Sequence, residues 1–150
     1  MEVNPTLSSP KDSIPDGGFD AVNRRDDSVT VLLVEDTEDN RQMMKKLLEL
    51  SDFRVVEATN GREAVELARR VRPQIILMDL SLPFLDGLAA TRQIRNMPGL
   101  SKVPIVAVSA HDTTDFHNEA LDAGCNAYVT KPIYYPELED LVNRLLAEIH

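Results

Sequence analysis

The sequence predicts an α/β domain over residues 29–150, in which helices cover both faces of a five-stranded parallel sheet. Short apolar runs rich in β-branched residues alternate with segments whose apolar residues recur about every 3.6 positions. The connections between these segments are short, and such alternation implies parallel strands joined by right-handed crossovers. Three of the five runs are almost continuously apolar, which is typical of strands buried on both faces.

The strands, in chain order, are predicted at residues 29–34, 54–58, 75–78, 103–108 and 127–129. Five strands in strict alternation with five helices favour the flavodoxin-like strand order 2-1-3-4-5. In that order the first and third strands are neighbours, and the sheet is doubly wound.

Helical spacing follows each strand, and several residues mark where helices begin or end. Asn60 with Glu63 predicts an N-cap, Gly124 predicts the end of the fourth helix, and Pro136 suits a first helical position. Gly87 is expected to permit a tight backbone turn. The fourth helix has a thin apolar stripe, so we expect it to be mobile. The clearest pattern is that of the fifth helix, whose apolar residues form one stripe: Leu138, Leu141, Val142, Leu145, Leu146 and Ile149. The first helix is marked by Met43, Met44, Leu47, Leu48 and Leu50, and the second by Ala64, Leu67, Ala68 and Val71.

Length and composition fit one soluble domain of 150 residues, with 43% apolar and 27% charged residues. Residues 1–28, rich in Pro, Gly, Ser and Asp, predict a flexible tail ahead of the domain. Cys125 is the one cysteine and is expected to be a small packing residue. There is neither a membrane-length apolar run nor a secretory signal, so a cytoplasmic location is expected. The net charge of −9 argues against binding nucleic acid or an anionic membrane.

Residues able to do chemistry gather where the predicted strands end. Ligands of doubly wound sheets bind beyond the carboxyl ends of the strands, near the point where the strand order reverses. We therefore expect the residues that follow four of the strands to form one site. They are Glu35 and Asp36 after the first strand, Asp79 after the third, Ser109 after the fourth, and Thr130 and Lys131 after the fifth.

Three carboxylates at this edge predict a divalent cation. Two carboxylates about 4 Å apart repel each other by about 4 kcal/mol at an effective dielectric constant of about 20. All-oxygen ligands favour Mg²⁺, whereas the cysteine and the histidines lack zinc-ligand spacing. Asp79 emerges directly from a buried strand and can attack phosphorus to form an acyl phosphate. Mg²⁺, Lys131 and the Ser109 hydroxyl would then neutralise the phosphoryl oxygens.

These motifs together resemble the receiver domain of two-component response regulators, of the single-domain, chemotaxis-Y-like kind. The matching segments are VLLVED, IILMDLSLPFLDG, IVAVSA and AYVTKP, and the resemblance covers residues 29–150. It implies that Asp79 is the phosphoacceptor. It also implies that Asp36, Glu35 acting mainly through water, and the backbone carbonyl of Ser81 hold Mg²⁺ together with Asp79.

The resemblance also implies how the domain signals. Lys131 would contact the phosphoryl group, Ser109 would move toward it, and Tyr128 would turn inward as Ser109 moves. The peptide bond before Pro132 would be cis. The donor would be a histidine kinase or a histidine phosphotransfer protein, and an unknown target protein would read the face formed by the fourth helix, fifth strand and fifth helix. The expected kinase contacts are Thr37, Asn40, Arg41 and Met44.

Other interpretations remain beside a single-domain regulator, which is favoured because the chain ends directly after the fifth helix. The chain could be the terminal receiver of a hybrid histidine kinase. A phosphatase of the haloacid dehalogenase type would need a second aspartate where Ser81 stands. An unphosphorylated scaffold is disfavoured because the set of acidic, hydroxyl and lysine residues is complete. A receiver holds a signal and turns over no substrate, so we do not expect an enzyme.

Overall fold

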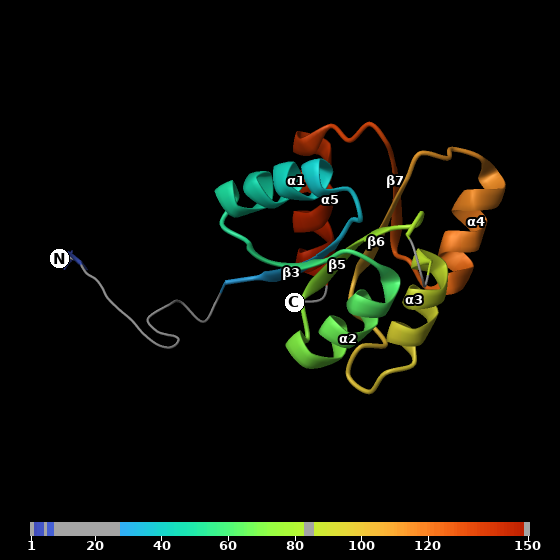
Figure 1. Cartoon of the computed structure of the whole chain (residues 1–150), viewed down its shortest axis with the longest axis horizontal. Coiled ribbons are helices and arrows are strands. Elements are labelled where there is room, and N and C mark those ends of the chain that lie inside the picture. Colours follow the sequence, from blue (N-terminus) through green and yellow to red (C-terminus); the bar gives the residue numbers. More distant parts are fainter. Residues whose placement is uncertain (1, 5, 8–27, 83–85, 149–150) are drawn as a thin grey trace.

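Five parallel strands form the central sheet of the computed structural model (Figure 1), which describes residues 2–4, 6–7, 28–82 and 86–148. Their spatial order is β4-β3-β5-β6-β7, which is the predicted order 2-1-3-4-5. All four pairings are parallel, as predicted. The strands are β3 (Thr30–Val34), β4 (Arg54–Ala58), β5 (Ile75–Asp79), β6 (Ile105–Ser109) and β7 (Ala127–Thr130).

The described residues at the N-terminus form a separate sheet. Two short strands, β1 (Glu2–Asn4) and β2 (Thr6–Leu7), pair with each other. The rest of the predicted tail up to residue 27 lies outside the described residues, as do residues 83–85 and Ile149. None of the described helices is long and apolar enough to cross a membrane.

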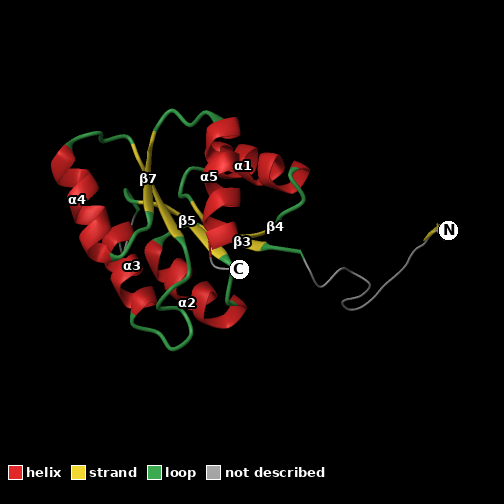
Figure 2. Cartoon of the chain, turned by 180° about the vertical axis from the view of Figure 1, so that it is seen from behind, coloured by secondary structure: helices red, strands yellow, loops and turns green. Residues whose placement is uncertain are grey.

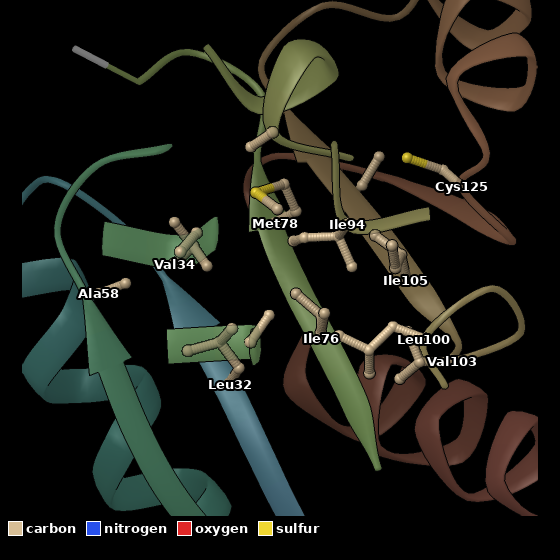
Figure 3. Close-up of a cluster of buried hydrophobic side chains, with 14 of the residues drawn as sticks. Leu32, Val34, Ala58, Ile76, Met78, Ile94, Leu100, Val103, Ile105 and Cys125 are labelled. Atoms are coloured by element: carbon tan, nitrogen blue, oxygen red, sulfur yellow. The ribbon is translucent and has the colours of Figure 1, made fainter. Parts of the chain in front are cut away.

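Five helices cover the sheet in two layers: α1 (Glu38–Leu50), α2 (Gly61–Val71), α3 (Gly87–Arg95), α4 (Thr114–Ala123) and α5 (Tyr135–Glu148). Figures 1 and 2 show α1 and α5 together on one side, and α2, α3 and α4 on the other. Side chains of a strand alternate between the two faces. Leu32 therefore packs in the cluster under α2 and α3, which Figure 3 shows, while Leu33 packs under α1 and α5.

The helix ends follow the sequence signals closely. Asn60 accepts a hydrogen bond from the Glu63 N–H at 2.9 Å, so the predicted N-cap of α2 is confirmed. Gly124 ends α4 in the left-handed region at φ 116°. α5 begins at Tyr135, so Pro136 is its second residue. The five apolar residues that predict the first helix all lie in α1, although Met43 and Leu50 are on its outer side, 56% and 81% exposed.

Cys125 is buried, as its predicted packing role requires, and its sulfur lies 3.9 Å from the Thr91 hydroxyl. Burial raises the pKa of the thiol, and the reactive form of cysteine is the thiolate. We therefore expect iodoacetamide at pH 8 to alkylate the folded protein at least about tenfold more slowly than the protein in urea, because the buried sulfur is both less ionised and less accessible. Intact mass measures both rates, and equal rates would contradict the assigned burial.

Candidate functional site

The acidic cluster forms where two neighbouring strands end. The sequence predicted that Asp79 follows its strand, but Asp79 is the last residue of β5. β3 and β5 are adjacent, with Val34 opposite Met78, so the next residues, Glu35 and Asp79, lie at the same level. Carboxylate oxygens of Glu35, Asp36 and Asp79 consequently lie within 4.8 Å of one another. Glu35 and Asp79 are 7% and 4% exposed, whereas Asp36 is open to solvent. The cluster thus has a buried floor and one accessible ligand.

Lys131 brings a positive charge to this floor from the end of β7. Its Nζ lies 3.3 Å from Asp79 Oδ2 and 3.4 Å from Glu35 Oε1. Burial acts to lower the pKa of Lys131, but Asp79 and Glu35 outweigh it, and the pKa is raised. The lysine therefore stays protonated and faces the two buried carboxylates.

One ammonium does not neutralise three carboxylates. Burial, with a further contribution from the Asp79 charge, raises the pKa of Glu35, although the Thr37 N–H and Lys131 act in the opposite direction. The remaining negative charge and the all-oxygen donor set fit a hard divalent cation such as Mg²⁺. The residues present therefore suit the metal that the sequence predicts.

The turn after β5 approaches the central carboxylate. The Ser81 N–H donates to Asp79 Oδ1 at 2.9 Å, and the Leu80 N–H donates to the Val108 carbonyl at 3.0 Å. These bonds place Ser81 beside Asp79, at the exposed side of the cluster. The Lys131–Pro132 peptide is cis, which the resemblance implied.

Gly87 has a different role from the predicted tight turn. It is the first residue of α3, and the described glycines with positive φ are Gly99 and Gly124. A Cβ atom at Gly87 would lie 2.4 Å from the Asp79 carbonyl oxygen and 2.8 Å from the Leu80 Cα. The prediction was wrong about the reason: this position requires glycine because helix and strand backbone pass close together.

Ser109 and Tyr128 meet the backbone of the same residue, His111. The buried Ser109 hydroxyl accepts from the His111 N–H at 3.1 Å, and the Tyr128 hydroxyl donates to the His111 carbonyl at 2.7 Å. The half-buried Tyr128 ring also stacks on His117, with 3.9 Å between ring centroids. His111 therefore links the two side chains. The sequence did not indicate this connection, because every residue except proline has a backbone N–H and carbonyl and the residue type carries no signal.

Two sequence-predicted residues lie elsewhere. The Thr130 hydroxyl donates to Asp112 at 3.2 Å and is directed to the loop before α4. Met44, a predicted kinase contact, is buried, because its face of α1 packs on the sheet; the exposed methionine is Met43. Thr37 and Asn40 are exposed, as a contact surface requires.

Arg41 is predicted as a kinase contact, but its side chain is 13% exposed and bonds within the site. Its side chain donates to the Glu35 carbonyl and to the Glu57 carboxylate, each at 3.1 Å. No short motif marks such a residue, because Glu57 belongs to the neighbouring strand β4. The fold and the site together define an α/β protein with a candidate cation site around a buried aspartate.

Comparison with known proteins gives the family. A family model for the response regulator receiver domain matches residues 31–143. The polar-differentiation response regulator DivK of Brucella anthropi is 34% identical over 119 residues, which span 79% of this chain and 97% of that relative. The chain therefore belongs to the response regulator receiver domain family.

Solved structures agree with this assignment. The receiver domain of the sensor histidine kinase PA1611 from Pseudomonas aeruginosa PAO1, which holds a magnesium ion in its active-site cleft, is 37% identical with a TM-score of 0.76; the similarity covers 80% of this chain and 98% of that one. The receiver domain of the Francisella response regulator 1452 is 28% identical with a TM-score of 0.77, covering 82% of this chain and all of that one.

Proposed function

We propose that this chain is a phosphorelay receiver whose Asp79 accepts a phosphoryl group in a reaction that requires Mg²⁺. The observation that carries the proposal is the buried Asp79 carboxylate, with Lys131 at 3.3 Å and two further carboxylates beside it. Glu35, Asp36, Asp79 and the backbone carbonyl of Ser81 would hold the metal. Bound there, Mg²⁺ would offset the charge of the carboxylates and of the incoming phosphoryl oxygens.

The donor is a phosphohistidine of a histidine kinase or of a histidine phosphotransfer protein. An Asp79 carboxylate oxygen forms a bond to phosphorus while the bond from phosphorus to the donor imidazole nitrogen breaks, and the leaving nitrogen keeps that electron pair. The product is an aspartyl phosphate on this chain and an unphosphorylated donor histidine. Lys131 offers its ammonium to a phosphoryl oxygen, and the chain turns over no further substrate.

Signalling would pass through the link at His111. When Ser109 turns toward the phosphoryl group, its hydroxyl leaves the His111 N–H. The loop before α4 then shifts, the bond from Tyr128 to the His111 carbonyl is lost, and the Tyr128 ring turns inward. A downstream protein would read the changed surface of α4, β7 and α5.

The domain carrying this function spans residues 29–150, with residues 1–28 as a tail. A receiver module of a hybrid histidine kinase is a second candidate, favoured by the similarity to the PA1611 receiver. The two candidates share the phosphoacceptor chemistry and differ in what precedes the receiver. The mass of the natural gene product separates them.

The test uses a small phosphodonor and the wild-type chain. After incubation with acetyl phosphate and Mg²⁺, the intact mass should increase by one phosphoryl group. Replacing Mg²⁺ with a chelator should abolish the increase. An unchanged mass with the metal, together with no binding of a beryllofluoride analogue, would favour the scaffold interpretation.

A further inference from the structure

The Glu35 backbone is held from both sides. Its N–H donates to the Ala58 carbonyl at the end of β4, 3.0 Å away. Its carbonyl accepts from Arg41 Nη1 at 3.1 Å. This carbonyl belongs to the peptide unit that joins Glu35 to Asp36. The Arg41 bond therefore fixes the orientation of that peptide plane, and with it the direction in which the Asp36 side chain points. Asp36 is the exposed carboxylate of the cluster, with less packing than its partners to hold it.

Arg41 is itself held in place. It lies in the first turn of α1, where its N–H donates to the Thr37 carbonyl at 2.9 Å. Its Nε donates to Glu57 Oε1 at 3.1 Å, and its side chain is 13% exposed. The planar guanidinium can bind the carboxylate through one nitrogen and the carbonyl through another, which a lysine ammonium does with far less geometric control.

We infer that Arg41 is a positioning residue that orients the Glu35–Asp36 peptide for cation binding; the inference rests on the proposed Mg²⁺ site. Charge alone predicts the opposite effect, because a cation beside the acidic cluster repels Mg²⁺. Removing Arg41 should tighten metal binding if only its charge matters, and should weaken it if the residue positions Asp36. The direction of the change separates the two roles.

Lys45 provides a matched control. It lies one turn further along α1 and also pairs with Glu57, with Nζ 3.3 Å from Oε2. No contact joins it to the acidic cluster among the described residues. Arg41→Met and Lys45→Met each remove one positive charge from Glu57 and keep an unbranched apolar stem, so the helix should be retained.

The experiment is a Mg²⁺ titration followed by NMR, since the chain has no tryptophan to report binding by fluorescence. Arg41→Met should raise the Kd about tenfold, in the range seen for residues that orient metal ligands. Lys45→Met should leave the Kd unchanged or lower it. Arg41→Lys, which keeps the charge, should also raise the Kd, because one ammonium does not bridge Glu57 and the Glu35 carbonyl. Unfolding midpoints in metal-free buffer establish that each variant is folded.

Two outcomes would overturn the inference: an Arg41→Met variant that binds Mg²⁺ as tightly as Lys45→Met, or an Arg41→Lys variant with the wild-type Kd. Failure of the wild-type chain to bind Mg²⁺ would instead contradict the proposed function on which the inference rests. The titration of the wild-type chain therefore distinguishes the two failures.

Discussion

Asp79→Asn should abolish the mass increase with acetyl phosphate, the largest effect expected of any single substitution in this chain. The amide has nearly the shape of the carboxylate and can still accept from the Ser81 N–H. It lacks the negatively charged oxygen that attacks phosphorus in the proposed reaction. The loss should therefore occur in a folded protein, which the unfolding midpoint of the same sample shows.

The same variant should raise the stability of the metal-free protein and weaken the stabilisation that Mg²⁺ provides. In metal-free buffer Asp79→Asn removes repulsion with Glu35 and Asp36 at the loss of one ion pair, since Lys131 keeps its contact with Glu35. Its free energy of unfolding should rise by about 1 kcal/mol, well below the roughly 4 kcal/mol of an isolated like-charged pair. Excess Mg²⁺ should stabilise the wild type more than the variant. A metal that binds the native state raises the free energy of unfolding, and the variant has one carboxylate fewer to bind it.

Asp86→Asn is the control for both measurements. Asp86 caps α3 by accepting from the Ala89 N–H at 2.8 Å, and asparagine caps a helix about as well as aspartate. This variant makes the same chemical change outside the acidic cluster. It should be phosphorylated normally and should keep the wild-type response to Mg²⁺. A similar loss in both variants would contradict the assignment of Asp79 as phosphoacceptor.

Strand order and the site edge could be predicted because they depend on local patterns. Buried parallel strands are apolar throughout, and residues that follow them leave the sheet at one edge. Glu35, Asp36 and Asp79 therefore needed only the alternation of strands and helices to be brought together. The same rule predicts that Lys131 lies at this edge of the sheet, and the distance of 3.3 Å between Lys131 and Asp79 agrees with that prediction.

The parts that could not be predicted depend on contacts between distant backbone segments. Adjacent Met43 and Met44 are equally apolar, and only the rotation of α1 on the sheet decides that Met44 is buried. The two bonds of Arg41 join α1 to the ends of β3 and β4, a relation with no spacing signal in the chain. Gly87 was identified from the sequence, but a tight turn and a close approach of two backbone segments both require glycine. The residue type alone therefore does not tell which of the two applies.

Gly87→Ala should destabilise the protein by about 1–2 kcal/mol, although the substitution places a better helix former in α3. Alanine gains about 1 kcal/mol over glycine inside a helix, and less is expected at a first helical residue. Overpacking a tight site costs about 1–3 kcal/mol. Here the Cβ would lie 2.4 Å from the Asp79 carbonyl oxygen and 2.8 Å from the Leu80 Cα, and both atoms are backbone. No side-chain rotation relieves these contacts, so the steric cost should exceed the gain.

The displacement in Gly87→Ala should also reach the site, because the displaced carbonyl oxygen belongs to Asp79, the proposed phosphoacceptor. The Gly87 N–H faces the Leu80 carbonyl at 3.4 Å, so α3 cannot retreat without stretching its link to the turn after β5. The strand end must therefore give way in part, and Asp79 moves relative to Lys131, which follows β7. We expect slower phosphorylation by acetyl phosphate together with a lower unfolding midpoint in urea. A variant as stable as the wild type would show that the backbone relaxes without cost, and the proposed reason for glycine would then be wrong.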